Sequence, residues 1–134
     1  LASIAEVLPH LAVACFSGSH LSSHERRDLA HGVLALGPRV ALITAGSAGA
    51  YAYSAHGEHH EPIVPTTVVD ALGAGDAFIT GFLHHWCQGA DLPRAMAEGA
   101  RSGAAACRYE GAFGRPLDVT DEQIAAIAVR VHSR

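Results

Sequence analysis

Short apolar runs alternate with helix-like segments along the first half of the chain. Residues 11–16 (LAVACF) form a continuous apolar run, which is typical of a strand buried on both faces. A helix is predicted next, because Ser22 and Glu25 have capping-box spacing and apolar residues recur at helical period up to Gly37. Residues 39–46 (RVALITAG) then predict a second buried strand that ends in glycine.

The middle of the chain predicts a hairpin followed by two helices. An alternating stretch that turns near Gly57 indicates strands at 49–54 and 59–64. Residues 76–89 (DAFITGFLHHWCQG) are apolar nearly all round, which indicates a helix buried in the protein. Residues 91–107 predict a second helix, and its run of small residues would allow close packing against a neighbour.

The order of the elements indicates an α/β layered fold. A glycine-rich loop at 108–118 and a last amphipathic helix, capped by Thr120 and Gln123, complete the predicted elements. In such folds ligands bind at the carboxyl ends of the parallel strands. The segments ITAGSAG (43–49) and DALGAGD (70–76) are therefore expected at the same edge of the sheet.

The composition is that of one globular domain, with 134 residues of which 49% are hydrophobic and 16% charged. A net charge of -4 without a basic stripe argues against a nucleic-acid partner. No secretory signal opens the chain, and no apolar run approaches the roughly 20 residues of a membrane span. The scattered cysteines Cys15, Cys87 and Cys107 predict reduced thiols in a cytoplasmic protein, two of them on buried faces.

The turn between Leu72 and Asp76 predicts an anion site. The first amides of a helix lack partners and carry the positive end of the helix dipole, and small side chains would let a phosphate reach them. An acceptor hydroxyl held beside Asp76 could then pass its proton to the carboxylate while attacking a γ-phosphoryl group. The alternative is structural: a glycine turn followed by an aspartate that only caps the helix.

The longer pattern VVDALGAGDAFITGFL (68–83) resembles the signature of the ribokinase-like (PfkB) sugar kinases, in which an Asp-Thr-x-Gly-Ala-Gly-Asp motif opens the catalytic helix. VALITAGSAGAY (40–51) is similar to the strand and glycine turn that precede the motif in this family. GAAACRYEGAFG (103–114) is similar to the segment that closes the nucleotide and cation region. Within the family, RYEGAFG (108–114) and LPHLAVACFS (8–17) most resemble fructoselysine 6-kinases, which phosphorylate Amadori products.

The resemblance implies a three-layer α/β ribokinase-like (Rossmann-like) fold and the cofactors ATP, Mg²⁺ and a monovalent cation such as K⁺. It implies that Asp76 is the catalytic base. The implied nucleotide-binding positions lie in the strand end, the glycine turn and the second helix: Thr44, Gly46, Gly73, Ala74, Gly75 and Ala100. The implied ligands of the monovalent cation are a carboxylate and backbone carbonyls: Asp70, Leu72, Ala106 and Gly111.

The chain departs from the family pattern at two places. Ala71 stands where the family more often has threonine, and SGSH (17–20) stands where an Asn-x-x-Glu motif is linked to magnesium and phosphate. ATP oxygens and water would then have to supply the magnesium ligands. Nothing resembles the family's sugar-binding glycine motif or lid strands. Because the chain opens at Leu1 in the end of a predicted helix, we expect residues 1–134 to be the C-terminal nucleotide-binding and catalytic part of a longer kinase domain; a trimmed start is the alternative.

The leading hypothesis is an ATP-dependent kinase for a sugar or Amadori-type sugar-amine, with a homodimer as a possible assembly. A catalytically silent nucleotide-binding or partner module and a nucleoside kinase of the same fold are the alternatives. Two other segments invite simpler interpretations. HGEHHE (56–61) could bind a metal but is better interpreted as a solvated hairpin tip. SHERRD (23–28) is interpreted as a solvated helix face.

Overall fold

The structure of the protein is a computed structural model that describes residues 2–112. Its centre is a mixed sheet with the strand order β1-β2-β3-β4. β1 (Val13–Ser17) pairs in parallel with β2 (Val40–Thr44). β3 (Ala50–Ser54) and β4 (Gly57–Glu61) add to β2 as an antiparallel hairpin.

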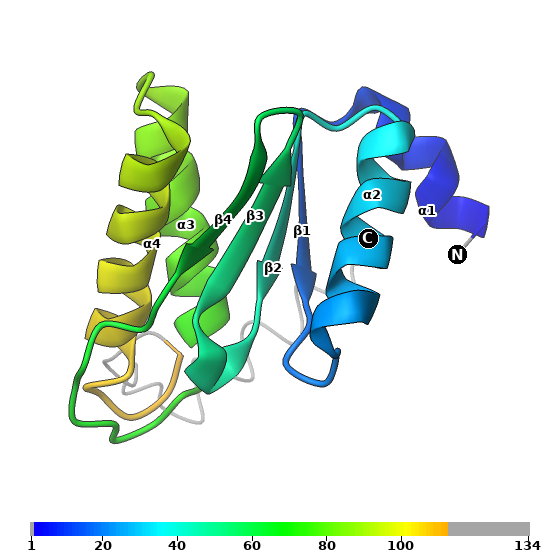
Figure 1. Cartoon of the computed structure of the whole chain (residues 1–134). Helices are drawn as coiled ribbons and strands as arrows, with labels where there is room; N and C mark the ends of the chain where they lie inside the picture. The colour runs from blue at the N-terminus through cyan, green and yellow to red at the C-terminus, as the bar shows by residue number, and fades with distance from the viewer. Residues whose placement is uncertain (1, 113–134) are drawn as a thin grey trace, which may run out of the picture.

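Helices cover both faces of this sheet (Figure 1). One face carries η1 (Leu8–His10) and α2 (Ser23–Ala35), and the other carries α3 (Ala74–Cys87) and α4 (Leu92–Ala106). The first helix, α1 (Ala2–Val7), lies beyond α2, away from the sheet. A single turn, η2 (Gly46–Ala48), joins β2 to β3. The predicted three-layer α/β arrangement is therefore confirmed.

β2 is the strand that holds the two helical layers together. Val40 and Leu42 belong to the apolar cluster under α3 and α4, whereas Ala41 and Ile43 belong to the cluster under α2. All four side chains are buried, because successive side chains of a strand point to opposite faces. This two-sided burial is the reason why residues 39–46 have a continuous apolar pattern, as predicted.

The prediction of two-sided burial is wrong for β1. The strand begins at Val13, and only Ala14 within it is buried, while Cys15 and Phe16 are half-buried. β1 has a paired neighbour on one side only among the described residues, so it forms an edge of this sheet. An apolar run favours burial of a strand, but it does not determine whether neighbouring elements are present to cover both of its faces.

The hairpin forms as predicted, but β4 begins two residues earlier than expected. The turn contains only Ala55 and His56, so Ser54 lies opposite Gly57. Pro62 follows the last residue of β4, and a proline cannot donate to a ladder of backbone hydrogen bonds. The turn length and this proline together shift the strand to residues 57–61.

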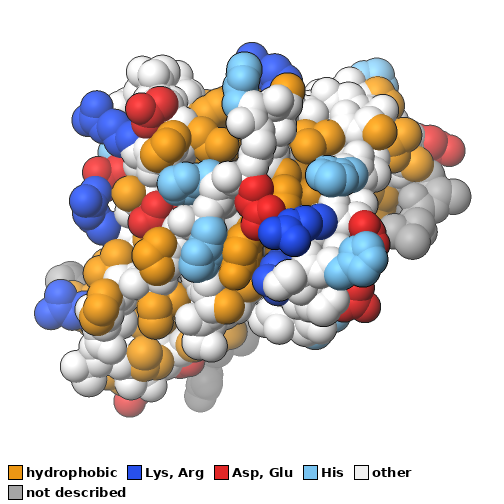
Figure 2. Space-filling model, viewed as in Figure 1, with side chains coloured by type: hydrophobic (Ala, Val, Ile, Leu, Met, Phe, Trp, Pro, Cys, Tyr) orange, Lys and Arg blue, Asp and Glu red, His pale blue; other side chains and the backbone are white. Residues whose placement is uncertain are grey.

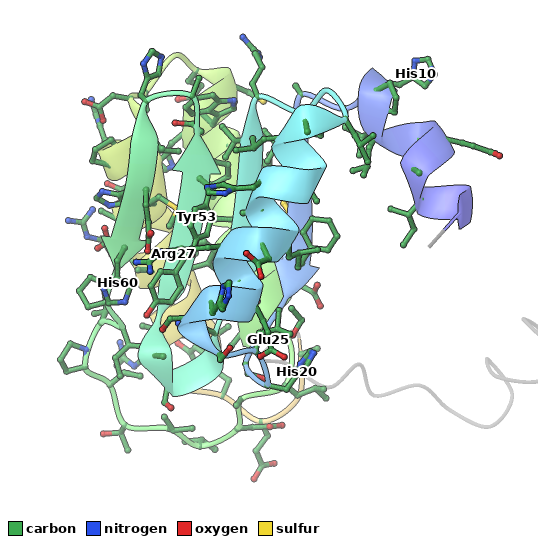
Figure 3. The ribbon with its side chains drawn as sticks, turned by 45° about the vertical axis from the view of Figure 1, so that its right-hand side comes forward. His10, His20, Glu25, Arg27, Tyr53 and His60 are labelled. Carbon is green, nitrogen blue, oxygen red and sulfur yellow. The ribbon has the colours of Figure 1, made fainter. Side chains whose placement is uncertain are left out.

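The capping box of α2 is confirmed. The Ser22 amide donates to Glu25 Oε2 (2.8 Å), and the Glu25 amide donates to Ser22 Oγ (3.3 Å). The interpretation of residues 23–28 as a solvated face is wrong for Arg26, which is 8% exposed. The neighbouring Arg27 donates from Nε to Glu58 Oε2 on β4 (2.9 Å), so this helix face lies against the hairpin (Figure 3).

Small residues let α3 and α4 pack closely, as predicted. A Cβ atom on Gly99 would lie 2.9 Å from the Phe78 carbonyl oxygen, and one on Gly103 would lie 3.1 Å from the Ala74 carbonyl oxygen. α3 is less buried than predicted, because only Phe78, Gly81 and Phe82 are buried and its remaining side chains are partly or fully exposed. Layering against one sheet buries one face of a helix, even when the helix is apolar on most sides.

Two predicted elements are not tested here. The helix expected after Thr120 and the part of the glycine-rich loop beyond residue 112 lie outside the described residues. No helix among residues 2–112 is both long enough and apolar enough to cross a membrane.

Candidate nucleotide site

The two glycine segments singled out from the sequence meet at one edge of the sheet. This edge carries the ends of β1 and β2, the start of α3 and the end of α4, and lies at the bottom of Figure 1. A cavity of about 440 Å³ opens there, which is a volume typical of small-molecule sites. Five of the six predicted nucleotide-binding positions line it: Thr44, Gly46, Ala74, Gly75 and Ala100.

Gly73 is required by the backbone of the turn that precedes α3. Its φ of 77° is in the left-handed region, which residues with a Cβ atom adopt at a cost. A Cβ atom at this position would also lie 2.9 Å from the backbone of Ala112. The turn therefore packs directly against the segment that follows α4. Gly73 is not among the cavity-lining residues and acts by shaping the turn.

The first turn of α3 offers backbone donors beside the cavity. The Ala74 amide donates to the Ala71 carbonyl (3.2 Å), so this predicted phosphate donor is already engaged. The amides of Gly75 and Asp76 make no hydrogen bond within residues 2–112. These two groups stand at the positive end of the α3 dipole, which favours an anion. A Cβ atom on Gly75 would lie 3.9 Å from Thr44 Oγ1, across the gap between α3 and β2.

Asp76 is the third residue of α3, and its side chain is exposed. The cap position is Gly73, and no side chain caps this helix, so the alternative of a capping aspartate is wrong. Within the described residues the Asp76 carboxylate makes no hydrogen bond, while its backbone carbonyl accepts from Thr80 Oγ1 (2.8 Å). A carboxylate with free lone pairs next to a helix start can accept a proton from a bound hydroxyl.

Asp70 joins the glycine turn to the segment that follows α4. Its Oδ1 accepts from the Leu72 amide (2.9 Å) and its Oδ2 from the Gly111 amide (3.0 Å). Hydrogen bonds from Leu72 and Gly111 lower the pKa of the Asp70 carboxyl. The Cys107 carbonyl accepts from the Asp70 amide (3.3 Å), which adds a second link between the same two segments.

The predicted cation ligands come together only in part. Leu72 and Gly111 present amides to Asp70, whereas a cation would need their carbonyl oxygens. The Ala106 carbonyl accepts from the Tyr109 amide at 3.4 Å, a long hydrogen bond. No cluster of three or more His, Cys, Asp or Glu residues within positions 2–112 is arranged to hold a metal ion. The monovalent-cation site stays a prediction.

The segment SGSH lies at the end of β1. Ser17 and His20 stand at the positions of the carboxamide and the carboxylate of the family motif, while Ser17 and Ser19 line the cavity. The backbone between them is held by a hydrogen bond from the Gly18 amide to the Thr44 carbonyl (2.8 Å). These residues can hydrogen-bond a phosphate or a metal-bound water, but they supply no negative charge.

Sequence reasoning missed one wall of the cavity. It is built by the segment that connects β4 to α3, through Pro62, Ile63, Val64, Thr66 and Val68. Figure 2 shows hydrophobic side chains gathered over the lower left of the molecule, where this segment and α4 run in Figure 1. The two prolines of the segment are a sequence signal for extended chain, but they do not say where that chain goes.

The contacts and burial of the histidines and cysteines singled out from the sequence give them no role in the proposed chemistry. The interpretation of HGEHHE as a solvated hairpin tip is wrong for residues 57–61, which form β4 with His59 and Glu61 half-buried. The His59 and His60 rings contact different partners. His85 Nδ1 lies 3.0 Å from the Gly81 carbonyl oxygen, within α3. Cys15 is half-buried, and burial raises the pKa of its thiol. Cys107 is half-buried on the cavity wall, whereas Cys87 is exposed.

Both glycine segments fall within a match to a known protein family. The model of the pfkB family carbohydrate kinases matches residues 11–118, which include both glycine segments. The chain belongs to this family. A fructosamine kinase from Bacillus subtilis is 39% identical over 108 residues, which make up 81% of this chain and 38% of that protein. A fructoselysine 6-kinase from Shigella flexneri is 35% identical over 107 residues, or 80% of this chain and 41% of that protein.

The fold of this PfkB chain is also found in a solved kinase. The aminoimidazole riboside kinase of Salmonella enterica, in complex with aminoimidazole riboside and an ATP analogue, superposes with a TM-score of 0.72 at 29% identity. The match covers 91% of this chain and 44% of that one. The family and fold predicted from the sequence are confirmed. The chain spans about two fifths of the length of the relatives that it matches.

Proposed function

We propose that this chain is the C-terminal, nucleotide-binding and catalytic part of an ATP-dependent kinase that phosphorylates a hydroxyl group of a sugar or sugar-amine. The observation that carries the proposal is the start of α3. The Gly75 and Asp76 amides are free of partners within the described residues, and the adjacent Asp76 carboxylate is also unengaged. Together these groups supply an anion-binding donor pair and a proton acceptor at a helix start that borders a cavity.

The chemistry follows from these groups. The amides of Gly75 and Asp76 would stabilise the negative charge on the transferred phosphoryl group. The Asp76 carboxylate would take the proton of the acceptor hydroxyl while that oxygen bonds to the γ-phosphorus. The bond from the γ-phosphorus to the bridging oxygen breaks, so that ADP leaves with the electron pair. The products are the phosphorylated acceptor, ADP and a proton on Asp76.

The nucleotide would lie in the cavity between β2 and α3, with the base near Ala100. Mg²⁺ would be held mainly by ATP oxygens and water, because Ser17 and Ser19 offer only hydroxyl groups on this wall. The link from Asp70 to Gly111 would hold the turn in place, and a monovalent cation would bind nearby through carbonyl oxygens. We propose a cytoplasmic location, as for a protein whose cysteines are reduced.

The similarity to fructosamine and fructoselysine kinases favours an Amadori-type acceptor. A nucleoside acceptor is the second candidate, because a relative that binds aminoimidazole riboside has the same fold at 29% identity. A catalytically silent module is the third candidate, and the loss of the Asn-x-x-Glu motif at residues 17–20 favours it. The acceptor-binding part is the region in which these candidates would differ.

The test uses the full-length protein and an assay of ADP release with fructoselysine, fructose, ribose and aminoimidazole riboside as acceptors. Asp76→Asn should lower kcat by roughly 10²–10⁴-fold, the usual contribution of a general base, and should leave ATP binding intact. Asp28→Asn is the matched control, because Asp28 is exposed on α2 in the opposite layer. Turnover of Asp76→Asn close to that of the control would remove Asp76 from the mechanism, and no acceptor-dependent ADP release would favour the silent module.

A further inference from the structure

The turn at residues 45–49 forms part of the cavity wall. Gly46, Ser47 and Gly49 line the cavity from this turn. The Ala45 amide donates to the Gly49 carbonyl (2.8 Å), which closes the turn on itself. Two further hydrogen bonds lie within the turn, from the Ala48 amide to the Ala45 carbonyl (3.1 Å) and from the Gly49 amide to the Gly46 carbonyl (3.1 Å). The neighbouring strand β4 adds contacts from outside the turn.

The end of β4 contacts this turn through two consecutive residues. His60 Nε2 lies 2.8 Å from the Ala48 carbonyl oxygen, and the imidazole must donate, because a carbonyl can only accept. A Cβ atom on Gly49 would collide with the Glu61 carbonyl oxygen, so the two backbones are in close contact there. Gly49 has a φ of 85°, which glycine adopts without strain.

A stack of side chains fixes the orientation of the His60 ring. The ring lies on Tyr51 of β3, with centroids 4.4 Å apart and planes 20° from parallel. The Arg26 guanidinium lies 4.3 Å from the centroid of the Tyr51 ring. Arg26 is itself held by hydrogen bonds to the Leu21 carbonyl (2.6 Å) and to Ser23 Oγ (3.1 Å).

The stack therefore runs from α2 across β3 to β4. Figure 3 shows His60 on the face of the sheet that also carries Tyr53, the face covered by α2. His59 is the natural comparison, because it precedes His60 on β4 and its side chain takes the opposite face. Its Nε2 lies 3.2 Å from Glu61 Oε2, within the strand, and it does not line the cavity.

We infer that His60 is a positioning residue for nucleotide binding, which acts through the Ala48 carbonyl on the cavity wall formed by Gly46 and Ser47. This inference rests on the proposed function, since it assumes that the cavity binds the nucleotide. His60 does not itself line the cavity, and its polar contact is with the Ala48 carbonyl, so its substitution should weaken nucleotide binding and leave binding of the acceptor sugar unaffected.

The test compares three variants of the full-length protein. His60→Phe keeps a ring that can stack on Tyr51 but removes the N–H donor. It should raise the Kd and KM for ATP about three- to tenfold, which corresponds to the loss of one hydrogen bond. The KM for the sugar and kcat should stay within twofold of wild type. His60→Gln, whose amide can donate, should recover part of the affinity, and His59→Phe should change none of these values.

Three outcomes would overturn the inference. The first is a wild-type Kd for ATP in His60→Phe, and the second is an equal loss of affinity for ATP and for the sugar in that variant. The third is a loss of ATP affinity in His59→Phe as large as that in His60→Phe. The Asp76→Asn variant keeps the two proposals separate. Loss of turnover in Asp76→Asn together with normal ATP affinity in His60→Phe refutes only the positioning role. Full turnover in Asp76→Asn refutes the catalytic role proposed above, whatever His60 does.

Discussion

Alanine substitutions at Gly73 and Gly75 should have different effects, although the two residues are only two positions apart. The first should lower the stability of the fold, and the second should weaken nucleotide binding. At Gly73 an alanine must adopt a φ of 77° and meet Ala112 at 2.9 Å. The left-handed backbone costs about 1–2 kcal/mol and the overpacking about 1–3 kcal/mol. Gly73→Ala should therefore lower the free energy of unfolding by roughly 2–5 kcal/mol.

At Gly75 the same substitution meets only Thr44 Oγ1, at an ordinary contact distance of 3.9 Å. Gly75 lies in the first turn of α3, where alanine is a better helix former than glycine by at most about 1 kcal/mol. Stability should be unchanged or slightly raised. The methyl group would occupy the gap through which, in the proposed mode of binding, a phosphate reaches the Gly75 and Asp76 amides. Losing one hydrogen bond to a charged group costs about 1.5–3 kcal/mol, which corresponds to a roughly 10- to 100-fold weaker Kd for ATP.

The measurement combines urea unfolding with titrations of ATP and adenosine on the full-length protein. Adenosine lacks phosphates, so its Kd should change little in Gly75→Ala, and the larger side chain of Gly75→Val should widen the difference. Gly32→Ala is the matched control. Gly32 lies in α2 with no atom within 4 Å of an added Cβ, so its substitution tests helix propensity alone.

Two results would contradict this reasoning. Wild-type ATP affinity in Gly75→Ala would mean that the phosphates do not approach the first turn of α3. An equal loss of affinity for ATP and for adenosine, together with a lower free energy of unfolding, would mean that the substitution disturbs the fold. The gap between Gly75 and Thr44 would then not be a site for phosphate.

Three further predictions address folding, reactivity and completeness. Hydrogen bonds from Ser22 lower the pKa of the Glu25 carboxyl, so the stability that Glu25 contributes is present at neutral pH and is lost as the pH falls through and below the ordinary range of a glutamate pKa. The free energy of unfolding in urea should therefore vary less with acid pH in Glu25→Gln than in wild type. A maleimide should label exposed Cys87 faster than half-buried Cys15, whose pKa is raised by burial, and mass spectrometry of partly labelled protein should give this order. Residues 1–134 alone should release no ADP with fructoselysine, fructose or ribose and should self-associate in size-exclusion chromatography, because Ile63 and Val68 are among its exposed apolar side chains. Robust sugar-dependent ADP release by this chain would show that the acceptor site lies within it.

The elements that were predicted correctly are those whose contacts are local in sequence. The capping box of Ser22 and Glu25 uses residues three positions apart, and its hydrogen bonds are formed wherever that helix packs. The glycine turn before α3 is local in the same way, because the φ of Gly73 is a property of one residue. β2 is the exception: its continuous apolar run predicted burial on both faces, and distant segments of this chain cover both faces.

The wrong predictions concern contacts between distant segments. Arg26 has the sequence environment of a solvated residue, but it is buried, and its guanidinium lies against Tyr51 of the distant strand β3. The edge position of β1 likewise depends on which strands are available to pair with it. Burial of a polar or apolar side chain is decided by its neighbours in space, which no local pattern encodes.

By itself the sequence determined the family, the order of the elements and the residues proposed for phosphate binding and proton transfer, because glycines, caps and the motif around Asp76 carry that information in a few adjacent positions. Only the tertiary structure decided that the Ala74 amide is already engaged, that residues 62–68 form a wall of the cavity and that His60 holds the turn at Ala48. These facts depend on how the chain folds back on itself. The distances between the segments that form the cavity are set by the packing of whole layers. That packing is the sum of many weak contacts between residues far apart in the sequence.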